Sequence, residues 1–251
     1  MERRLGYREM PPPSALRTGV SALWIRIMPL EPAPEVEVWP DAGVDIIWHQ
    51  GREPLLAGAD TGPLPASLEP GAVLIGARFR PGAAGPALCL PMYEVRDQRV
   101  DLTDVRADLA RELPGDLTPE VALRRVVEIT REILLEGRPD PIVTQGAERL
   151  RDTAGSVDDV LNGSSLSARQ LRRRFHAALG YGPKTLQRVL RFQLLIKLLN
   201  TGSGASLASA AAQAGYSDQA HMTRECRRLS GKTPRELIPG LVSDSFNTEV
   251  G

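Results

Sequence analysis

Four arginines stand within six residues of the segment LSARQLRRRFHAALGYGP (166–183), at positions 169, 172, 173 and 174. A guanidinium group presents several N–H donors in one plane. It therefore forms paired hydrogen bonds with phosphate oxygens, or with O6 and N7 of a guanine base. A solvated basic helix face is the simpler explanation of such a cluster. The other features of the chain decide between a solvated face and an anion-binding surface.

The arginine cluster lies in the basic part of a neutral chain. The 251 residues include 31 Lys and Arg and 31 Asp and Glu. Residues 166–235 hold thirteen of the bases and only two of the acids, Asp218 and Glu225. The excess of eleven positive charges there is balanced by an equal negative excess elsewhere. This asymmetry predicts a localised polyanion-binding module, although a basic segment also suits an acidic protein partner.

An internal repeat connects the arginine cluster with a second basic segment. Four residues of the first copy recur fifty-one positions later in the second: Leu171, Phe175, Gly180 and Pro183 correspond to Met222, Cys226, Gly231 and Pro234. In each copy a glycine follows a helical pattern and a proline comes shortly after, which is typical of a helix C-terminus. The sequence thus predicts two similar helical units, whose structural core these eight residues form.

Helical periodicity separates an apolar face from a polar face in both copies. At about 100° per residue, Leu171, Phe175 and Leu179 share one side, and Arg169, Arg173 and His176 lie on the other. In the second copy, the apolar stripe contains Met222, Cys226 and Leu229, and the opposite side contains Ala220, Arg224 and Arg227. The pattern therefore predicts that Arg173 and Arg224 point away from the core. Arg174 flanks the apolar stripe, which favours a structural or phosphate-binding role.

The residues before the second copy predict a helix-turn-helix. The stretch SLASAAAQAGYS (206–217) is typical of a short Ala-rich helix, with Gly215 in a tight turn and Ser217 as the N-cap of the next helix. The first copy has a weaker version of this pattern, with Ser156 and Ser167 as caps. Between the copies, residues 183–202 predict one largely buried helix. It could hold two recognition helices in successive major-groove segments.

The first hundred residues have a different, β-rich pattern. Short apolar stretches at 22–28, 36–39, 44–49 and 72–79 are bounded by Gly, Pro and Asp, which predicts a small barrel or sandwich, a cupin-like barrel being one form. Thr118 and Pro119 then begin a helix, with Val121, Val127 and Leu134 near one face. The two prolines of RPDPI (138–142) indicate a boundary. The predicted class is α+β, with a β-rich N-terminal domain and an all-α C-terminal domain that contains two helix-turn-helix units.

The predicted domain boundaries follow from these changes in pattern. Residues 1–105 form a sensing or dimerisation domain, 106–141 a helical connector, 142–240 a DNA-binding domain and 241–251 a flexible tail.

The two repeats together resemble the AraC-type bipartite helix-turn-helix domain of bacterial transcription regulators. The segments that carry the resemblance are LSARQLRRRFHAALGYGPKTLQRVLRFQ and AAQAGYSDQAHMTRECRRLSGKTPREL. The resemblance implies sequence-specific binding of double-stranded DNA through both recognition helices. By position, the implied DNA-facing residues are Arg169, Arg172, Arg173, Gln219, His221, Thr223 and Arg224. For His221, reading a base and capping a polar surface remain equal alternatives.

The chain departs from that family in three places. Met222 and Cys226 stand where many members have Phe. Asp158 and Asp159 lie on the short helix before the first recognition helix. The N-terminal half does not resemble the sugar-binding domains of the best-known members. It is similar to an uncharacterised β-rich domain found in some relatives, through PDAGVDIIWHQG and AGADTGP.

The sequence contains no pattern typical of an enzyme, a metal site or a cofactor site. His49 has no second ligand at a suitable spacing, so a structural role is expected. Core packing is likewise the expectation for Trp39, Trp48, Phe79 and Tyr93, with a pocket lining as the alternative. Cys89 and Cys226 are far apart, which favours reduced thiols. The main alternative function is a cupin-like enzyme or small-molecule-binding protein whose basic module only localises it; a weaker one is an architectural nucleic-acid binder.

The expected setting is that of a bacterial regulator. Without a long apolar run or a signal peptide, the chain is expected in the cytoplasm, not in a membrane. DNA is the expected partner, with an unidentified small-molecule effector and RNA polymerase as further ones. Both a monomer and a homodimer are compatible with the sequence, and it does not distinguish an activator from a repressor.

Overall fold

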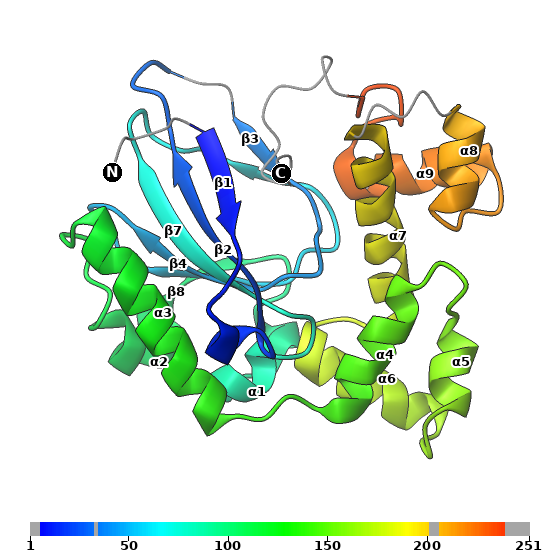
Figure 1. Ribbon diagram of the computed structural model, residues 1–251, viewed down its shortest axis with the longest axis horizontal. Coiled ribbons are helices and arrows are strands. Elements are labelled where there is room, and N and C mark those ends of the chain that lie inside the picture. Colours follow the sequence, from blue (N-terminus) through cyan, green and yellow to red (C-terminus); the bar gives the residue numbers. More distant parts are fainter. Residues whose placement is uncertain (1–5, 33–34, 201–205, 239–251) are drawn as a thin grey trace.

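The computed structural model describes residues 6–32, 35–200 and 206–238, in which an antiparallel sheet is followed by helices (Figure 1). The main sheet has six strands in the order β1-β2-β7-β4-β5-β8, and a separate ribbon pairs β3 with β6. The strands are β1 Gly6–Met10, β2 Val20–Ile27, β3 Val36–Val38, β4 Asp45–His49, β5 Leu55–Ala57, β6 Leu64–Ala66, β7 Val73–Phe79 and β8 Arg99–Asp101. All their pairings are antiparallel.

One face of the sheet is covered by helix α3 (Pro119–Glu136), which lies across β7 and β4 (Figure 1). Alternate strand residues such as Ile25, Ile46 and Ile75 are buried on this face, as the two-residue period of a strand requires. The predicted start of this helix, Thr118 followed by Pro119, is confirmed, although the Thr118 side chain makes no capping hydrogen bond.

The apolar face of α3 differs from the predicted one. Its buried residues are Ala122, Val126, Ile129, Thr130 and Ile133. Val121, Val127 and Leu134, which the pattern placed on one face, are only partly buried at its margins. The predicted face was therefore wrong, because the completely buried side of α3 consists of these five residues instead.

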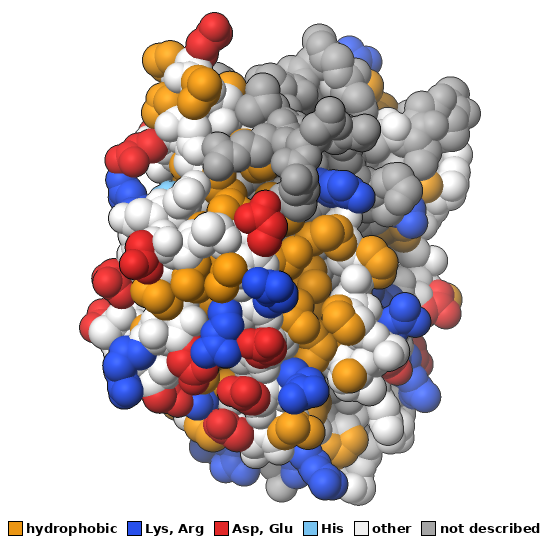
Figure 2. Space-filling model, turned by 60° about the vertical axis from the view of Figure 1, so that its left-hand side comes forward, with side chains coloured by type: hydrophobic (Ala, Val, Ile, Leu, Met, Phe, Trp, Pro, Cys, Tyr) orange, Lys and Arg blue, Asp and Glu red, His pale blue; other side chains and the backbone are white. Residues whose placement is uncertain are grey.

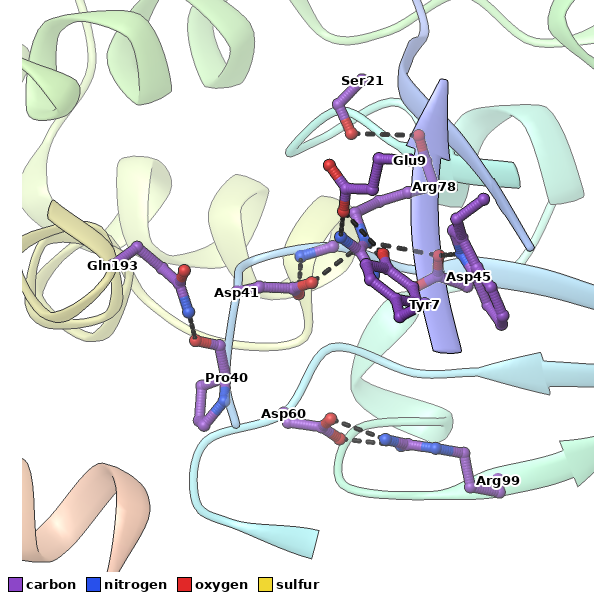
Figure 3. A network of polar contacts seen from close by, with 12 residues as sticks. Tyr7, Glu9, Ser21, Pro40, Asp41, Asp45, Asp60, Arg78, Arg99 and Gln193 are labelled. Carbon is purple, nitrogen blue, oxygen red and sulfur yellow. Dashed lines mark hydrogen bonds and ion pairs between the residues drawn. The ribbon is translucent and has the colours of Figure 1, made fainter. Parts of the chain in front are cut away.

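The opposite face of the sheet carries a smaller apolar cluster around Trp24, together with a partly buried polar network (Figure 3). Arg78 on β7 lies 2.8 Å from Glu9, 3.0 Å from Asp41 and 3.3 Å from Asp45. The indole of Trp24 donates a hydrogen bond to Asp45 at 2.6 Å. Burial raises the pKa of Asp45 to about 6, although Arg78 opposes this shift.

The sheet does not close into a barrel. Strands β1 and β8 lie at its two edges and do not pair with each other. The α+β class, with a β-rich first half and a helical second half, is confirmed; a closed barrel is not formed, because α3 rather than further strands covers the sheet. The remaining helices are α1 Ala84–Leu88, α2 Leu102–Ala110, α4 Pro141–Arg151, α5 Val157–Asn162, α6 Ala168–Leu179, α7 Pro183–Asn200, α8 Leu207–Gln213 and α9 Gln219–Ser230.

The halves of the molecule share a continuous hydrophobic core, which runs from the sheet through α1 and α3 to α6, α7 and α9. Polar contacts also join them. The Gln193 side chain on α7 donates to the Pro40 carbonyl at 2.5 Å (Figure 3). The rings of Trp39 and Phe192 meet edge to face, with centroids 6.1 Å apart. The segment that follows β3 therefore lies against the linker helix α7.

Figure 2 shows the side of the molecule that lies at the left in Figure 1. Acidic and basic side chains are intermingled there. In α3, for example, Arg125 pairs with Glu112 and with Glu128. Charges of both signs are thus mixed on this side rather than segregated.

Candidate nucleic-acid interface

Helix α6 is built as the repeat predicted. Ser167 is its N-cap and forms a capping box with Gln170, whose side chain accepts from the Ser167 N–H at 2.9 Å. Leu171, Phe175 and Leu179 are buried, as expected. Gly180 ends the helix with φ +83°, a left-handed conformation that glycine adopts without steric cost. The apolar side and both ends of α6 are thus fixed by local contacts.

The exposed side of α6 carries the predicted basic residues. Arg169, Arg172 and Arg173 are exposed, and none of the ion pairs found in the described parts of the chain involves them. Arg174 differs, because it pairs with Asp140 at 3.0 Å. Asp140 is also the N-cap of α4, accepting from the Ile142 N–H at 2.9 Å. Arg174 therefore connects α6 to α4, which agrees with a structural role.

Helix α9 repeats this construction, with one correction. Its N-cap is Asp218, which accepts from the His221 N–H at 2.6 Å, and not Ser217 as the pattern suggested. The Ser217 hydroxyl instead lies 3.1 Å from Nδ1 of His221. The start of the helix is displaced by one residue because the longer, charged Asp side chain reaches the free N–H groups. That hydrogen bond also lowers the pKa of Asp218.

The two sides of α9 are as predicted. Met222, Cys226 and Leu229 are buried, and Gly231 ends the helix with φ +71°. Burial raises the pKa of the Cys226 thiol to about 12. Gln219 and Arg224 are exposed, whereas His221 and Thr223 are half-buried. The Thr223 hydroxyl donates to the Gln219 carbonyl at 2.8 Å, and the ring of His221 stands edge-on to Tyr216.

The turn before α9 depends on Gly215, which has φ +79°. A Cβ at this position would also lie 3.2 Å from the Arg191 side chain and 3.4 Å from the Thr153 carbonyl oxygen. The buried alanines Ala210, Ala211 and Ala214 let α8 approach its neighbours closely. Helices α8 and α9 with this turn form the second helix-turn-helix unit.

The first unit consists of α5 and α6. Ser156 caps α5 in a capping box with Asp159, whose carboxylate accepts from the Ser156 N–H at 2.8 Å. Asp159 therefore stabilises the N-terminus of α5, where a negative charge is favourable. The acidic residues of this helix are thus compatible with the predicted unit.

Helix α7 holds the two units together. Seven of its residues are buried, among them Leu186, Val189 and Phe192. The Gln187 side chain donates to the Gly155 carbonyl at 2.9 Å, near α5. Arg188 pairs with Glu225 of α9 through two hydrogen bonds, one of them 2.8 Å long. This pair was not predicted, although it uses one of the two acids in the basic segment. The predicted end of the helix at 202 lies outside the described residues.

Four of the five N-terminal residues considered for a site or a pocket are buried. His49 is buried in β4, and burial lowers its pKa. Trp39, Trp48 and Phe79 belong to the core, whereas Tyr93 is 51% exposed, so the prediction of core packing was wrong for Tyr93.

Within the described ranges, no group of His, Cys, Asp or Glu is suited to hold a metal ion. Cys89 and Cys226 are both free thiols. None of the described helices has the length and apolar character of a membrane span.

Comparison with known families finds two separate matches along the chain. Residues 162–238 match a helix-turn-helix domain, and residues 8–101 match a domain of unknown function, DUF6597. The helix-turn-helix domain is of the AraC type, and the chain is a DNA-binding transcription regulator. The match to DUF6597 agrees with the uncharacterised β-rich domain that the sequence indicated.

Solved structures of ToxT from Vibrio cholerae are among those similar to this chain. A singly substituted ToxT in its apo form is 10% identical, with a TM-score of 0.48 over 88% of this chain and 98% of that one. Wild-type ToxT with a bound unsaturated fatty acid is also 10% identical, with a TM-score of 0.42 over 95% and 96% of the two chains. Nothing matches in the comparison with curated protein sequences.

Proposed function

We propose that this regulator binds one DNA duplex through the exposed sides of α6 and α9. The DNA-contacting residues in this proposal are Arg169, Arg172, Arg173, Gln219, His221, Thr223 and Arg224. The observation that supports it best is the placement of four arginines (169, 172, 173 and 224) on the exposed sides of two capped helices; none of the ion pairs in the described parts of the chain involves them. Such guanidinium groups are available to phosphates and to base edges.

The linker helix supports a bipartite mode of binding. Its 18 residues span about 27 Å. Successive major-groove segments on one side of a duplex are roughly 34 Å apart. One chain can therefore place two recognition helices in neighbouring segments, which a protein with one unit achieves only as a dimer.

The remaining parts of the chain have supporting roles in the proposal. Residues 1–105 form the sensing or dimerisation domain for an unidentified small-molecule effector, 106–141 the connector and 142–240 the DNA-binding domain. The regulator acts in the cytoplasm, as a monomer or homodimer, with RNA polymerase as a further partner and without catalytic activity of its own. The predicted tail, 241–251, lies outside the described residues.

Genome-wide mapping of bound DNA, followed by footprinting with the full chain, tests this function. We expect a small set of sites and protection of one short sequence at physiological salt. Affinity should fall steeply as salt increases, because bound arginines displace counterions from the phosphates. Uniform protection of any duplex would instead indicate an architectural nucleic-acid binder.

A further inference from the structure

Three adjoining depressions of the surface connect the two recognition helices across α7. The first, of about 440 Å³, lies along the exposed side of α6. The second, a hollow of about 540 Å³, shares Arg172 and His176 with the first and reaches Lys184 on α7 and Arg228 on α9. The third, of about 350 Å³, shares Lys184 and Arg228 with the second and extends to His221. Together they form one trough, here called the basic trough, which these five residues line from α6 to α9.

The basic trough opens on the side of the molecule that carries the proposed DNA-facing residues. Arg172 and His221 belong both to the trough and to those residues. Arg228 follows Arg224 by one helical turn, so both lie on the same side of α9. The trough therefore continues the two recognition surfaces instead of forming a separate cavity.

Three cations of the trough are available to a ligand. None of the ion pairs in the described parts of the chain involves Arg172, Lys184 or Arg228. The Lys184 amine donates a hydrogen bond to the side-chain oxygen of Gln187 at 3.0 Å, and an ammonium group has three donors. Each of these three cations can therefore still pair with a phosphate oxygen.

Two carboxylates among the described residues also line the trough, and both are engaged. Glu225 pairs with Arg188 through two hydrogen bonds. Asp97 accepts from the Thr61 N–H at 2.6 Å and lies 3.4 Å from the Arg96 guanidinium. The charge of the trough therefore remains positive, since neither carboxylate pairs with the three available cations.

The N-terminal half supplies one wall of the trough, where Arg96 stands beside Thr61 and Asp97. The Arg96 guanidinium donates to the Gly180 carbonyl at 3.2 Å, which holds it at the C-terminus of α6. A guanidinium has five N–H donors, so others remain for a ligand. Arg96 thus presents a cation of the N-terminal half at the DNA-binding helices.

The positive potential of the trough acts on His176. Burial lowers the pKa of His176, and the charges of Arg172 and Arg96 lower it further. Arg172 belongs to α6 and Arg96 to the N-terminal half, so cations from both halves act on the same imidazole. A polyanion in the trough is therefore attracted by both halves.

Bound DNA presents its backbone at the position of the trough. Between two successive major-groove segments on one side of a duplex lies the minor groove, with a sugar–phosphate strand along each edge. With α6 and α9 in the two segments, α7 and the trough face that stretch of backbone. An extended trough with several cations suits a continuous strand of phosphates.

We propose that the basic trough binds the DNA backbone between the two major-groove segments, and that Arg96 brings the N-terminal half into contact with the same duplex. Lys184 and Arg228 pair with phosphates, in addition to the seven residues of the proposed function. The inference rests on that function, because it needs both recognition helices on one duplex. The DNA interface then extends beyond residues 142–240, and displacement of Arg96 changes the affinity for every DNA sequence.

Mobility-shift titrations of the full chain at several salt concentrations test the trough, with the mapped site and an unrelated duplex of equal length as probes. Lys184→Gln, Arg228→Gln and Arg96→Gln should each weaken binding to both duplexes by about threefold or more. Each should also reduce the salt slope by about 1, because each removes one phosphate contact. Arg96→Lys should keep the wild-type slope, since it keeps the charge. Asp97→Asn, which keeps an acceptor for the Thr61 N–H, should strengthen binding to both duplexes, because it removes a carboxylate from the wall.

Arg131→Gln is the matched control. Arg131 is exposed on α3, which lies at the left of the sheet in Figure 1, whereas α7 and α9 lie at the right. The substitution removes the same charge far from the trough, so it measures the effect of net charge alone. Its affinity and salt slope should stay close to those of the wild type.

Values equal to those of Arg131→Gln in the Lys184 and Arg228 variants would overturn the trough as a DNA contact. The same result for Arg96→Gln would remove the N-terminal half from the interface. A loss confined to the mapped site would contradict a backbone contact, and weaker binding with an unchanged salt slope would assign the residue to the positioning of a helix instead.

Failure of this inference and failure of the proposed function give different results. If the wild type binds no duplex, the proposed function fails and this inference fails with it. If Arg173→Ala and Arg224→Ala weaken binding while the trough variants match the control, this inference alone fails.

Discussion

The guanidinium groups of Arg173 and Arg224 are exposed on separate helices, and no ion pair in the described structure involves either. We expect Arg173→Ala and Arg224→Ala to weaken binding to the mapped site. Loss of a base contact should cost about 1–3 kcal/mol and relax specificity at one position, whereas loss of a phosphate contact should weaken all sequences and reduce the salt slope. Mobility-shift titrations at several salt concentrations distinguish these cases. Unchanged affinity in both variants would remove the two residues from the interface.

The buried carboxyl of Asp45 should make stability depend on pH. Its pKa is raised to about 6 by burial, above its ordinary value of 3.8. The folded state therefore binds a proton more tightly than the unfolded state, and stability should fall as pH rises from about 4 to about 6. In Asp45→Asn, which keeps an acceptor for Trp24, this fall should be smaller by up to about 3 kcal/mol. Denaturant titrations across this pH range measure the difference, and parallel curves for the two proteins would contradict the assignment.

The recognition helices depend on their buried sides and on the turn before α9. Phe175→Ala should leave a cavity and cost roughly 3–5 kcal/mol, since Phe175 is completely buried. Gly215→Val should also destabilise the protein, because the residue has φ +79° and little space around it. Thermal melting is the measurement, with Arg224→Ala as the control that should leave the midpoint nearly unchanged. The reverse order of midpoints would mean that the inner and outer faces are exchanged.

At the start of α9, the contributions of Asp218 and Ser217 to helix capping can be compared by substituting each residue. Asp218→Ala should lower the thermal midpoint, because the N–H of His221 loses its acceptor. Ser217→Ala should have a smaller effect, since its hydroxyl caps no backbone group. The stabilisation by Asp218 should fade as pH falls through its lowered pKa, because the protonated side chain is a poorer acceptor. Equal midpoints for the two variants would place the cap elsewhere.

The molecule as a whole has one hydrophobic core that joins the sheet to the DNA-binding helices. We expect a fragment of residues 142–240 to bind DNA with strong salt dependence, because both repeats and the positive excess lie within it. The same fragment should melt at a lower temperature than the full chain. It loses contacts such as that of Trp39 with Phe192 and the pair of Lys232 with Glu37. Mobility shifts and calorimetry check the two expectations; DNA binding by the N-terminal half alone would contradict the first.

Local patterns alone were sufficient to predict the helical units. The apolar period of Leu171, Phe175 and Leu179, the glycines at 180 and 231 and the caps at 156 and 167 all act within a few residues of chain, where helix geometry is repetitive. The exposed position of Arg173 and Arg224 follows from the same period. The predictions from local sequence were wrong in two situations. At the start of α9, the neighbouring side chains of Ser217 and Asp218 compete to cap the same helix. In α3, packing against the sheet decides which residues are buried, such as Ala122 and Val126.

Contacts between distant segments were decided only by the tertiary structure. Which segments pack together decides the order of the six strands and leaves the sheet open. It also places Glu9, Asp41 and Asp45 around Arg78. The spacing of residues along one segment does not determine which segments pack together. The hollow lined by Arg96, Arg172 and Arg228 also depends on tertiary structure, because these residues come from three separate parts of the chain. The sequence by itself determined the two recognition helices and their basic sides. The fold alone determined what lies against them, since the packing free energy of the shared core depends on all these segments together.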